Sequence, residues 1–335
     1  MAKKRALITG ITGQDGSYLA ELLLKKGYEV SGIVRKTSHE EYANIGPIQD
    51  DLKLFQGDLL DPISLREIIQ KINPDEVYNL ASQSHPAESF KQPIHTAEIT
   101  GIGAHRVLDA TLDVNPKSKF YQASSSEMFG WVREIPQKED TPFNPANPYA
   151  AAKLYAFAMT KIYRESYNMF ACNGILFNHE SPRRHLGFVT QKVTYGAACA
   201  KLGIKNSEHL NEEGELIVKN GKVALGNLEA KRDWGYAADY VEAMYLMMQQ
   251  DKPDDFVVAT GETHTIKELC EEAYSYVELD YKDYVEIDSR FVRPTETGPL
   301  VGDPSKAKKI LGWEPKTKFK DLVRLMVDAH LARLK

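Results

Sequence analysis

The feature that most limits how this chain can fold is the alternation of short apolar runs with amphipathic stretches over residues 1–180. Apolar runs suited to buried strands occupy residues 5–9, 29–34, 53–57, 76–80, 119–123 and 171–176. Helical patterns lie between them, among them residues 16–26, 62–72 and 147–167. Such alternation is typical of a parallel sheet covered on both faces. The pattern predicts an α/β fold with a doubly wound parallel (Rossmann) sheet and ligands at the carboxyl ends of its strands.

The second half of the chain predicts a smaller α+β lobe. Residues 203–221 are polar, charged and punctuated by glycine, which indicates a surface excursion or hairpin. Residues 236–250 and 318–334 are expected to be helical, and residues 255–260 to form one more buried strand. We therefore predict a Rossmann domain over residues 1–177 plus about 230–262. The smaller lobe is predicted over about 178–229 plus 263–335.

Charge and cysteine content exclude several classes of protein. The net charge is −5, and no basic tract with interleaved aromatic residues is present, which argues against nucleic acid as a partner. Cys172, Cys199 and Cys270 have no metal-ligand spacing, and their odd number argues against a disulfide framework. No run approaches the ~20 apolar residues that span a bilayer, and no secretory segment opens the chain. We expect a cytoplasmic protein with neither a metal nor a membrane partner.

A glycine-rich turn follows the first predicted strand and opens the first helix. Gly10, Gly13 and Gly16 stand in GITGQDG, with Gln14 and Asp15 between the last two. Glycines there permit a tight turn and a close approach of the helix N-terminus to a pyrophosphate. Glycines also occur in turns that bind nothing. The strand–turn–helix context nevertheless favours dinucleotide binding.

The residues after the second strand discriminate between the two nicotinamide dinucleotides. NAD-binding proteins carry a carboxylate there for the ribose 2′-hydroxyl, whereas this chain has Arg35 and Lys36. Two cations suit a 2′-phosphate, so NADP is the predicted cofactor, the alternative being a solvated basic loop. Asp58 and Leu59 are expected to border the adenine. The ribose and pyrophosphate are expected to lie along Leu80, Ala81, Gln83 and Ser84.

Tyr149 and Lys153 lie one helical turn apart and predict an acid–base pair. The charge of the lysine would lower the pKa of the phenol, and its ammonium group could hydrogen-bond the nicotinamide ribose. The phenol could then exchange a proton with a sugar hydroxyl. This spacing also arises by chance in helices. Ser125, at the end of a predicted strand, makes the catalytic interpretation stronger.

Glu127 adds a carboxylate two residues beyond Ser125. A simple 4-epimerase or 4-reductase needs only the hydroxyl, tyrosine and lysine set. A dehydratase also needs a base for the C5 proton and an acid for the departing C6 hydroxyl, and one carboxylate could serve both steps. The alternative is a surface or capping glutamate.

Several longer segments resemble the GDP-mannose 4,6-dehydratases, and together they extend over essentially the whole chain. They are GITGQDGSYLAELLLKKGYEVSGIVRK (10–36), YNLASQSH (78–85), QASSSEMFG (122–130), LFNHESPRR (176–184), LGNLEAKRDWGYAADYVEAM (225–244), ATGETHTIKEL (259–269) and RPTE (293–296). The resemblance implies an extended short-chain dehydrogenase/reductase fold. It implies a catalytic set of Ser125, Glu127, Tyr149 and Lys153, with His179 and Arg184 at the cofactor. It also implies GDP-sugar contacts from Ser84, Glu127, Asn178, Lys192, Arg232, Arg293 and Glu296.

This resemblance implies a hydro-lyase that forms GDP-4-keto-6-deoxy-mannose from GDP-mannose with internally recycled NADP, in a homodimer or homotetramer. One alternative is an NADPH-dependent GDP-4-keto-6-deoxysugar reductase or epimerase, against which Glu127 argues. A second is a non-catalytic NADP-sensing protein, against which the retained tyrosine and lysine argue. The alternative role for Arg232 and Arg293 is to form salt bridges between the lobes rather than to bind the GDP-sugar.

Five departures from the family pattern leave the identity of the sugar open, including a heptose or an N-acetylated sugar. Ser125 stands where threonine is usual, and Ile99 where a tyrosine is common. RKTS replaces RRSS after the second strand, and residues 206–220 are an insertion. The segment RPTETGPLVGDP replaces RPTEVDLLLGDP.

Overall fold

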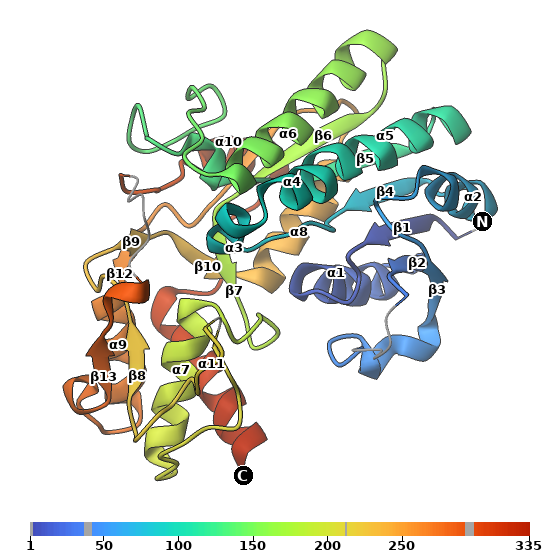
Figure 1. Cartoon of the computed structure of the whole chain (residues 1–335). Coiled ribbons are helices and arrows are strands. Elements are labelled where there is room, and N and C mark those ends of the chain that lie inside the picture. Colours follow the sequence, from blue (N-terminus) through green and yellow to red (C-terminus); the bar gives the residue numbers. More distant parts are fainter. Residues whose placement is uncertain (1–2, 37–41, 212, 292–297) are drawn as a thin grey trace.

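A single parallel sheet organises the protein. The structure is a computed structural model and describes residues 3–36, 42–211, 213–291 and 298–335. Within these ranges, seven strands pair in the order β11-β6-β5-β4-β1-β2-β3 (Figure 1). All neighbours are parallel. The strands are β1 (Arg5–Thr9), β2 (Glu29–Val34), β3 (Leu52–Gln56), β4 (Glu76–Asn79), β5 (Lys119–Ser125), β6 (Ala171–Leu176) and β11 (Phe256–Val258).

This topology confirms the predicted doubly wound sheet. Its order reverses between β1 and β4, so the connections that follow these two strands diverge and leave a crevice at their carboxyl ends. Residues 5–9, 29–34 and 171–176 form strands with the predicted bounds. The predicted strand at 255–260 exists as the shorter β11, which pairs with β6 at the edge of the sheet.

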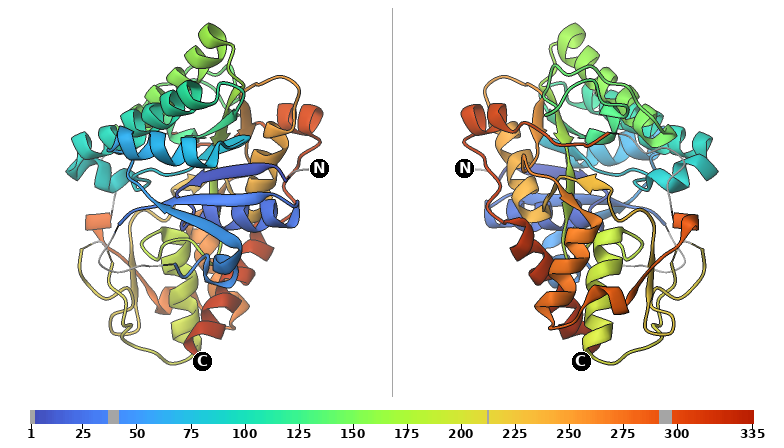
Figure 2. Two further views of the ribbon diagram at one scale, coloured as in Figure 1. Left: turned by 90° about the vertical axis from the view of Figure 1, so that its right-hand side faces the viewer. Right: turned by 90° about the vertical axis from the view of Figure 1, so that its left-hand side faces the viewer.

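Helices cover both faces of the sheet, and their bounds are α1 (Gln14–Lys25), α2 (Pro62–Ile72), α5 (Gly103–Val114), α6 (Pro148–Tyr167) and α8 (Ala237–Met248). α2 packs against α5 and α5 against α6 on one face, while α1 and α8 pack together on the other (Figures 1 and 2). The short helices α3 (Pro86–Lys91) and α4 (Pro93–Thr96), with a π-helical turn over Ala97–Ile102, lead into α5. No helix of the described ranges is long and apolar enough to cross a membrane.

Segments of the second half pack into a smaller part beside the sheet (Figure 2). Its helices α7 (Val189–Lys201), α9 (Ile266–Tyr276) and α11 (Phe319–Leu334) pack on one another, and α10 (Ser305–Leu311) packs on α8 instead. Three short strand pairs accompany them: β7 (Asn178–Glu180) with β10 (Trp234–Tyr236), β8 (Val223–Leu225) with β13 (Val285–Ile287), and β9 (Lys231–Arg232) with β12 (His264–Thr265). The exact domain boundaries stay a prediction.

The insertion at 206–220 folds against this smaller part. Leu210 and Leu216 form an antiparallel bridge within it, as expected of an excursion or hairpin. Ile217 and Val218 are buried in the core of the smaller part. Two ion pairs tie the insertion to its neighbours, since Glu213 lies 3.6 Å from Lys91 and Glu215 lies 3.1 Å from Arg290.

A buried ion pair closes the far edge of the sheet. The Arg164 guanidinium on α6 donates to both carboxylate oxygens of Asp255, at 2.8 and 2.7 Å. Asp255 Oδ1 also accepts from the backbone N–H and the side-chain amide of Asn173, each at 3.0 Å. One carboxylate therefore joins α6, β6 and the start of β11.

We expect Asp255→Ala to lower the free energy of unfolding by about 3–5 kcal/mol, because it leaves the Arg164 charge and the Asn173 donors without this partner. Glu29→Ala is the control: Glu29 pairs with Lys53 at 2.6 Å, but both side chains are exposed, so the loss should stay under about 1 kcal/mol. Denaturant unfolding of the two variants measures both values. Equal losses would contradict a structural role for the buried pair.

Candidate active site

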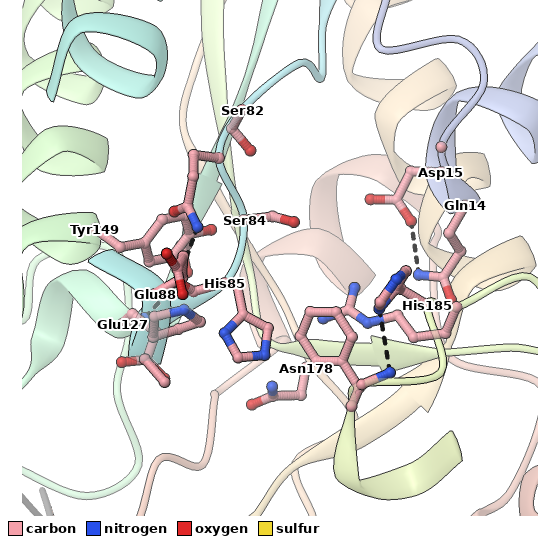
Figure 3. Close-up of a pocket in the computed structure, with 18 of the residues that line it drawn as sticks. Gln14, Asp15, Ser82, Ser84, His85, Glu88, Glu127, Tyr149, Asn178 and His185 are labelled. Carbon is pink, nitrogen blue, oxygen red and sulfur yellow. Dashed lines mark hydrogen bonds between the residues drawn. The ribbon is translucent and has the colours of Figure 1, made fainter. Parts of the chain in front are cut away.

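The site is a cavity of about 1350 Å³ at the carboxyl ends of the strands. Figure 3 shows Gln14 and Asp15 on one wall and Tyr149, Glu127 and Glu88 on the opposite wall, with His85 and Asn178 between them. Of the predicted residues, the cavity is lined by Gly10, Gly13, Gln14, Asp15, Gly16, Arg35, Asp58, Leu59, Leu80, Ala81, Gln83, Ser84, Ser125, Glu127, Tyr149, Lys153, Asn178, His179, Arg184, Lys192 and Arg232. Lys36 is exposed and does not line it. Arg293 and Glu296 lie outside the described residues.

The glycine-rich turn has the geometry of an anion cradle. Gly10 has φ +70°, and a Cβ there would lie 2.9 Å from the Ala81 nitrogen. A Cβ on Gly16 would lie 2.2 Å from the Gly10 carbonyl oxygen, so neither position accepts a side chain. α1 begins at Gln14, inside this turn, so its first backbone N–H groups have no partner within the helix, and its first residues line the cavity. The arrangement fits the pyrophosphate of a dinucleotide.

Asp15 and His179 form a buried pair that joins this turn to β7. His179 Nε2 lies 2.9 Å from Asp15 Oδ2, and His179 Nδ1 lies 2.7 Å from the Phe177 carbonyl. Both ring nitrogens face acceptors, which requires the doubly protonated imidazolium. Burial opposes the charge of each partner, but the opposite charge and the hydrogen bonds together outweigh it: the pKa of His179 is raised, and that of Asp15 is lowered to about 2. The pair places an imidazolium, neutralised by Asp15, beside the cradle.

The hydroxyl, phenol and ammonium groups predicted to be catalytic lie together at the end of β5. Burial raises the pKa of Tyr149 to about 12, against a lowering by its hydrogen bond with Ser125 and by the Arg184 charge. Burial lowers the pKa of Lys153 to about 8, and its Nζ donates to the Ala123 carbonyl at 2.8 Å. The sequence predicts a phenol whose pKa is lowered by lysine. The structure differs because both groups are buried, which favours their neutral forms.

Glu127 is held by a residue that the sequence did not single out. It lies in a 3-10 turn at Ser126–Phe129 that follows β5, and it is buried. Asn147 Nδ2 donates to Glu127 Oε2 at 2.9 Å, while Asn147 Oδ1 accepts from the Ala150 N–H at 2.8 Å as the N-cap of α6. The Asn-Pro pair indicates the start of the helix and its cap, whereas the contact with Glu127 depends on the fold. Through Asn147, the position of Glu127 is tied to the helix that carries Tyr149.

The opposite wall carries cations and aromatic rings from the smaller part. Arg184 Cζ lies 3.8 Å from the centroid of the Phe188 ring, and Lys192 Nζ lies 4.7 Å from that of Phe291. Arg232, on β9, donates to the Lys231 carbonyl at 2.7 Å. These cationic side chains place positive charge on this wall, which suits the binding of a diphosphate. Phe188 and Phe291 were not singled out from the sequence, because no pattern links them to the cations that they contact.

Known proteins are similar to this chain over nearly its whole length. The family model described as GDP-mannose 4,6 dehydratase matches residues 7–326. The chain is 51% identical to GDP-mannose 4,6 dehydratase 1 of Arabidopsis thaliana over 98% of this chain and 90% of that protein. It is 47% identical to the Homo sapiens GDP-mannose 4,6 dehydratase over 99% and 93%. Among solved structures, a Thermus thermophilus UDP-glucose 4-epimerase in complex with NAD superposes with a TM-score of 0.82, at 25% identity over 97% and 98%.

The Asp15–His179 pair predicts a characteristic dependence of stability on pH. The Asp15 contribution is present above its ordinary pKa of 3.8 and is lost as the pH falls through about 2. The His179 contribution is present below 6.5 and is lost as the pH rises through its raised pKa. The unfolding free energies of wild type and Asp15→Asn should therefore differ most at pH 4–6.5.

Urea unfolding across pH 3–9 measures this difference. Glu21→Gln is the control, because Glu21 pairs with Arg183, whose charge persists to high pH. Its effect should stay level from pH 6 to 9, while that of Asp15→Asn declines. A level difference for Asp15→Asn would show that His179 is not the charged partner.

Proposed function

The chain belongs to the GDP-mannose 4,6-dehydratase family, and on that premise we propose that it converts GDP-mannose to GDP-4-keto-6-deoxy-mannose as an NADP-dependent hydro-lyase. The observation that carries the proposal is the position of Glu127. Glu127 lines the cavity together with Ser125, Tyr149 and Lys153. Figure 3 shows it on the same wall as Tyr149. A 4-reductase or a 4-epimerase has no step for this carboxylate, whereas a dehydratase needs a base at C5.

A nicotinamide dinucleotide fits the chain's own residues. The turn at Gly10–Gly16 would hold its pyrophosphate, next to the imidazolium of His179. The similarity to an epimerase in complex with NAD supports this class of cofactor. Arg35 supports NADP over NAD, because it lines the cavity beyond β2 as a cation rather than a carboxylate. Asp58 and Leu59 would border the adenine, and Leu80, Ala81, Gln83 and Ser84 the ribose and pyrophosphate.

Tyr149 would begin the reaction by taking the proton from the C4 hydroxyl. The Ser125 hydrogen bond and the Arg184 charge oppose the effect of burial on its pKa, whereas the nearby Glu127 carboxylate adds to it. Lys153 would add its charge and hold the nicotinamide ribose. A dinucleotide bound in the cradle would supply the redox chemistry, an oxidation at C4 and a later reduction at C6. Glu127 would remove the C5 proton once C4 is a ketone, while the Asn147 amide holds the carboxylate in place.

The GDP-sugar would lie between the two walls of the cavity. Lys192 and Arg232 are cations for the diphosphate, and Asn178 offers an amide to the sugar. Arg293 and Glu296, also proposed to contact GDP, lie outside the described residues. The family resemblance further supports a cytoplasmic homodimer or homotetramer.

Arg35→Ala should weaken NADP binding by about 1.5–3 kcal/mol, or roughly 10–150-fold, because a charge-assisted phosphate contact is lost. Binding of NAD, which has no 2′-phosphate, should change little. Lys36→Ala is the matched control, since Lys36 does not line the cavity and its loss should affect NADP less. Calorimetric titration of both cofactors measures the constants. Equal affinity of the wild type for NAD and NADP would refute the assignment.

The reaction itself is tested by product analysis. With GDP-mannose, the wild type should release a product lighter by one water with no net change in NADPH absorbance, and dTDP-glucose and UDP-glucose should react far more slowly. Glu127→Gln should slow elimination by about 10²–10⁴-fold and leave reduced cofactor trapped with bound substrate. Tyr149→Phe should form no reduced cofactor at all.

Stoichiometric consumption of NADPH by the wild type would instead indicate the reductase alternative. Failure of the wild type to form reduced cofactor with any GDP-sugar, despite binding NADP, would favour a sensing protein. Near-normal elimination by Glu127→Gln would remove the mechanistic basis of the dehydratase proposal.

A further inference from the structure

We propose that His85 is the acid that protonates the C6 hydroxyl of the sugar as it leaves. This inference rests on the proposed dehydration, which needs both a base at C5 and an acid at C6. It assigns the second role to a residue outside the hydroxyl, carboxylate, tyrosine and lysine set.

The sheet topology brings His85 beside the chemistry. β4 and β5 are neighbours in parallel register, with Asn79 paired to Gln122. The segment that follows β4 therefore runs alongside Ser125 and Glu127, which follow β5. His85 ends that segment as the N-cap residue of α3, and it lines the cavity. Figure 3 shows its imidazole between Glu127 and Asn178.

Aromatic packing fixes the direction of the imidazole. The ring of His85 lies 5.2 Å from that of Phe188, tilted by 56°. Arg184 packs on the same phenylalanine, with its Cζ 3.8 Å from the ring centroid. Phe188 belongs to the segment that follows β7, so the contact spans the cavity from one wall to the other. His85 is therefore held through its backbone at the start of α3 and through its ring at Phe188. A side chain held in this way is pre-oriented for proton transfer.

The other groups near Glu127 are poorly suited to this role. Tyr149 is engaged at C4, and Lys153 donates to the Ala123 carbonyl. Glu88 is the remaining acidic group on that wall, and its Oε1 accepts from Gln92 Nε2 at 2.8 Å on its own helix. An imidazole is the side chain whose proton is exchanged most readily near neutral pH.

The step balances in atoms and charge. The C5–H bond breaks and its proton goes to the Glu127 carboxylate, while the electron pair forms the C5–C6 double bond. The C6–O bond breaks, and the hydroxyl leaves as water with the proton of the His85 imidazolium. Glu127 later returns its proton to C5. The proton that Tyr149 takes from the C4 hydroxyl balances the one that His85 gives up, so solvent exchange restores both groups.

The experiment separates C5 deprotonation from C6 elimination. His85→Gln is incubated with NADP and GDP-mannose in D₂O, and the recovered sugar is analysed by NMR. We expect elimination to fall by about 10²–10⁴-fold, while deuterium accumulates at C5 of recovered GDP-mannose, because Glu127 still acts and C4 is then reduced again. Glu127→Gln should show neither elimination nor exchange. His95→Gln, a like change at the cavity rim on α4, should match the wild type.

His85→Phe tests whether the residue serves only to pack on Phe188. The variant keeps an aromatic ring but has no proton to give, so elimination should stay as slow as in His85→Gln. Elimination at the wild-type rate by either variant would overturn the proposal and would indicate that Glu127 performs both steps. An equal loss of exchange and elimination in both variants, with an unchanged melting temperature, would also overturn it and would indicate that His85 only positions other groups. A wild type that does not dehydrate any GDP-hexose would instead refute the proposed function.

Discussion

The structure depends above all on the buried contacts between the first β–α turn and the strand β7. Asp15 pairs with the His179 imidazolium, while the Gln14 amide donates to the His179 carbonyl and its Oε1 accepts from Ser181 at 2.8 Å. The turn belongs to the sheet, and β7 begins the smaller part. A buried charge pair is costly unless both members are in place. The glycine-rich turn and the smaller part are therefore held in one register, and residues 165 positions apart can face the same ligand.

Local features of the site could be predicted from the sequence because their geometry is local. Gly10 and Gly16 are required by contacts within the turn and with the adjoining strand end, so their spacing indicates the cradle. Tyr149 and Lys153 share a face because a helix repeats every 3.6 residues. The sheet could be predicted because strands buried on both faces are continuously apolar, and β1, β2 and β6 accordingly have the predicted bounds. For the same reason the seventh strand was recognised, although only three of its residues pair.

Non-local features could not be predicted. β7, β9 and β12 have two or three residues each, which is too short for any periodicity to indicate a strand. Asn147 was assigned to a helix from its composition, but its side chain joins the helix cap to Glu127, a contact set by tertiary structure. The packing of Phe188 between His85 and Arg184 joins segments about a hundred residues apart. The ion pairs of the 206–220 insertion likewise depend on partners that only the fold brings near.

The electrostatics of the site show why a recognisable motif does not by itself define a reactive one. Burial raises the pKa of Tyr149 to about 12 and lowers that of Lys153 to about 8, so both groups are drawn toward their neutral forms. Two charges oppose this on the side of the sheet where ligands bind. Arg184 lowers the pKa of the phenol, and Asp15 raises that of the ammonium.

Both charges lie on the cavity wall that carries the glycine-rich turn, and a bound dinucleotide would bring further charge between them and the phenol. Because opposite charges nearby act most strongly at low dielectric, the same burial that holds the phenol protonated makes it sensitive to what occupies the cradle. Reactivity in this cavity is thus a property of the phenol, the ammonium and the ligand together, and the helical spacing of Tyr149 and Lys153 provides only its framework.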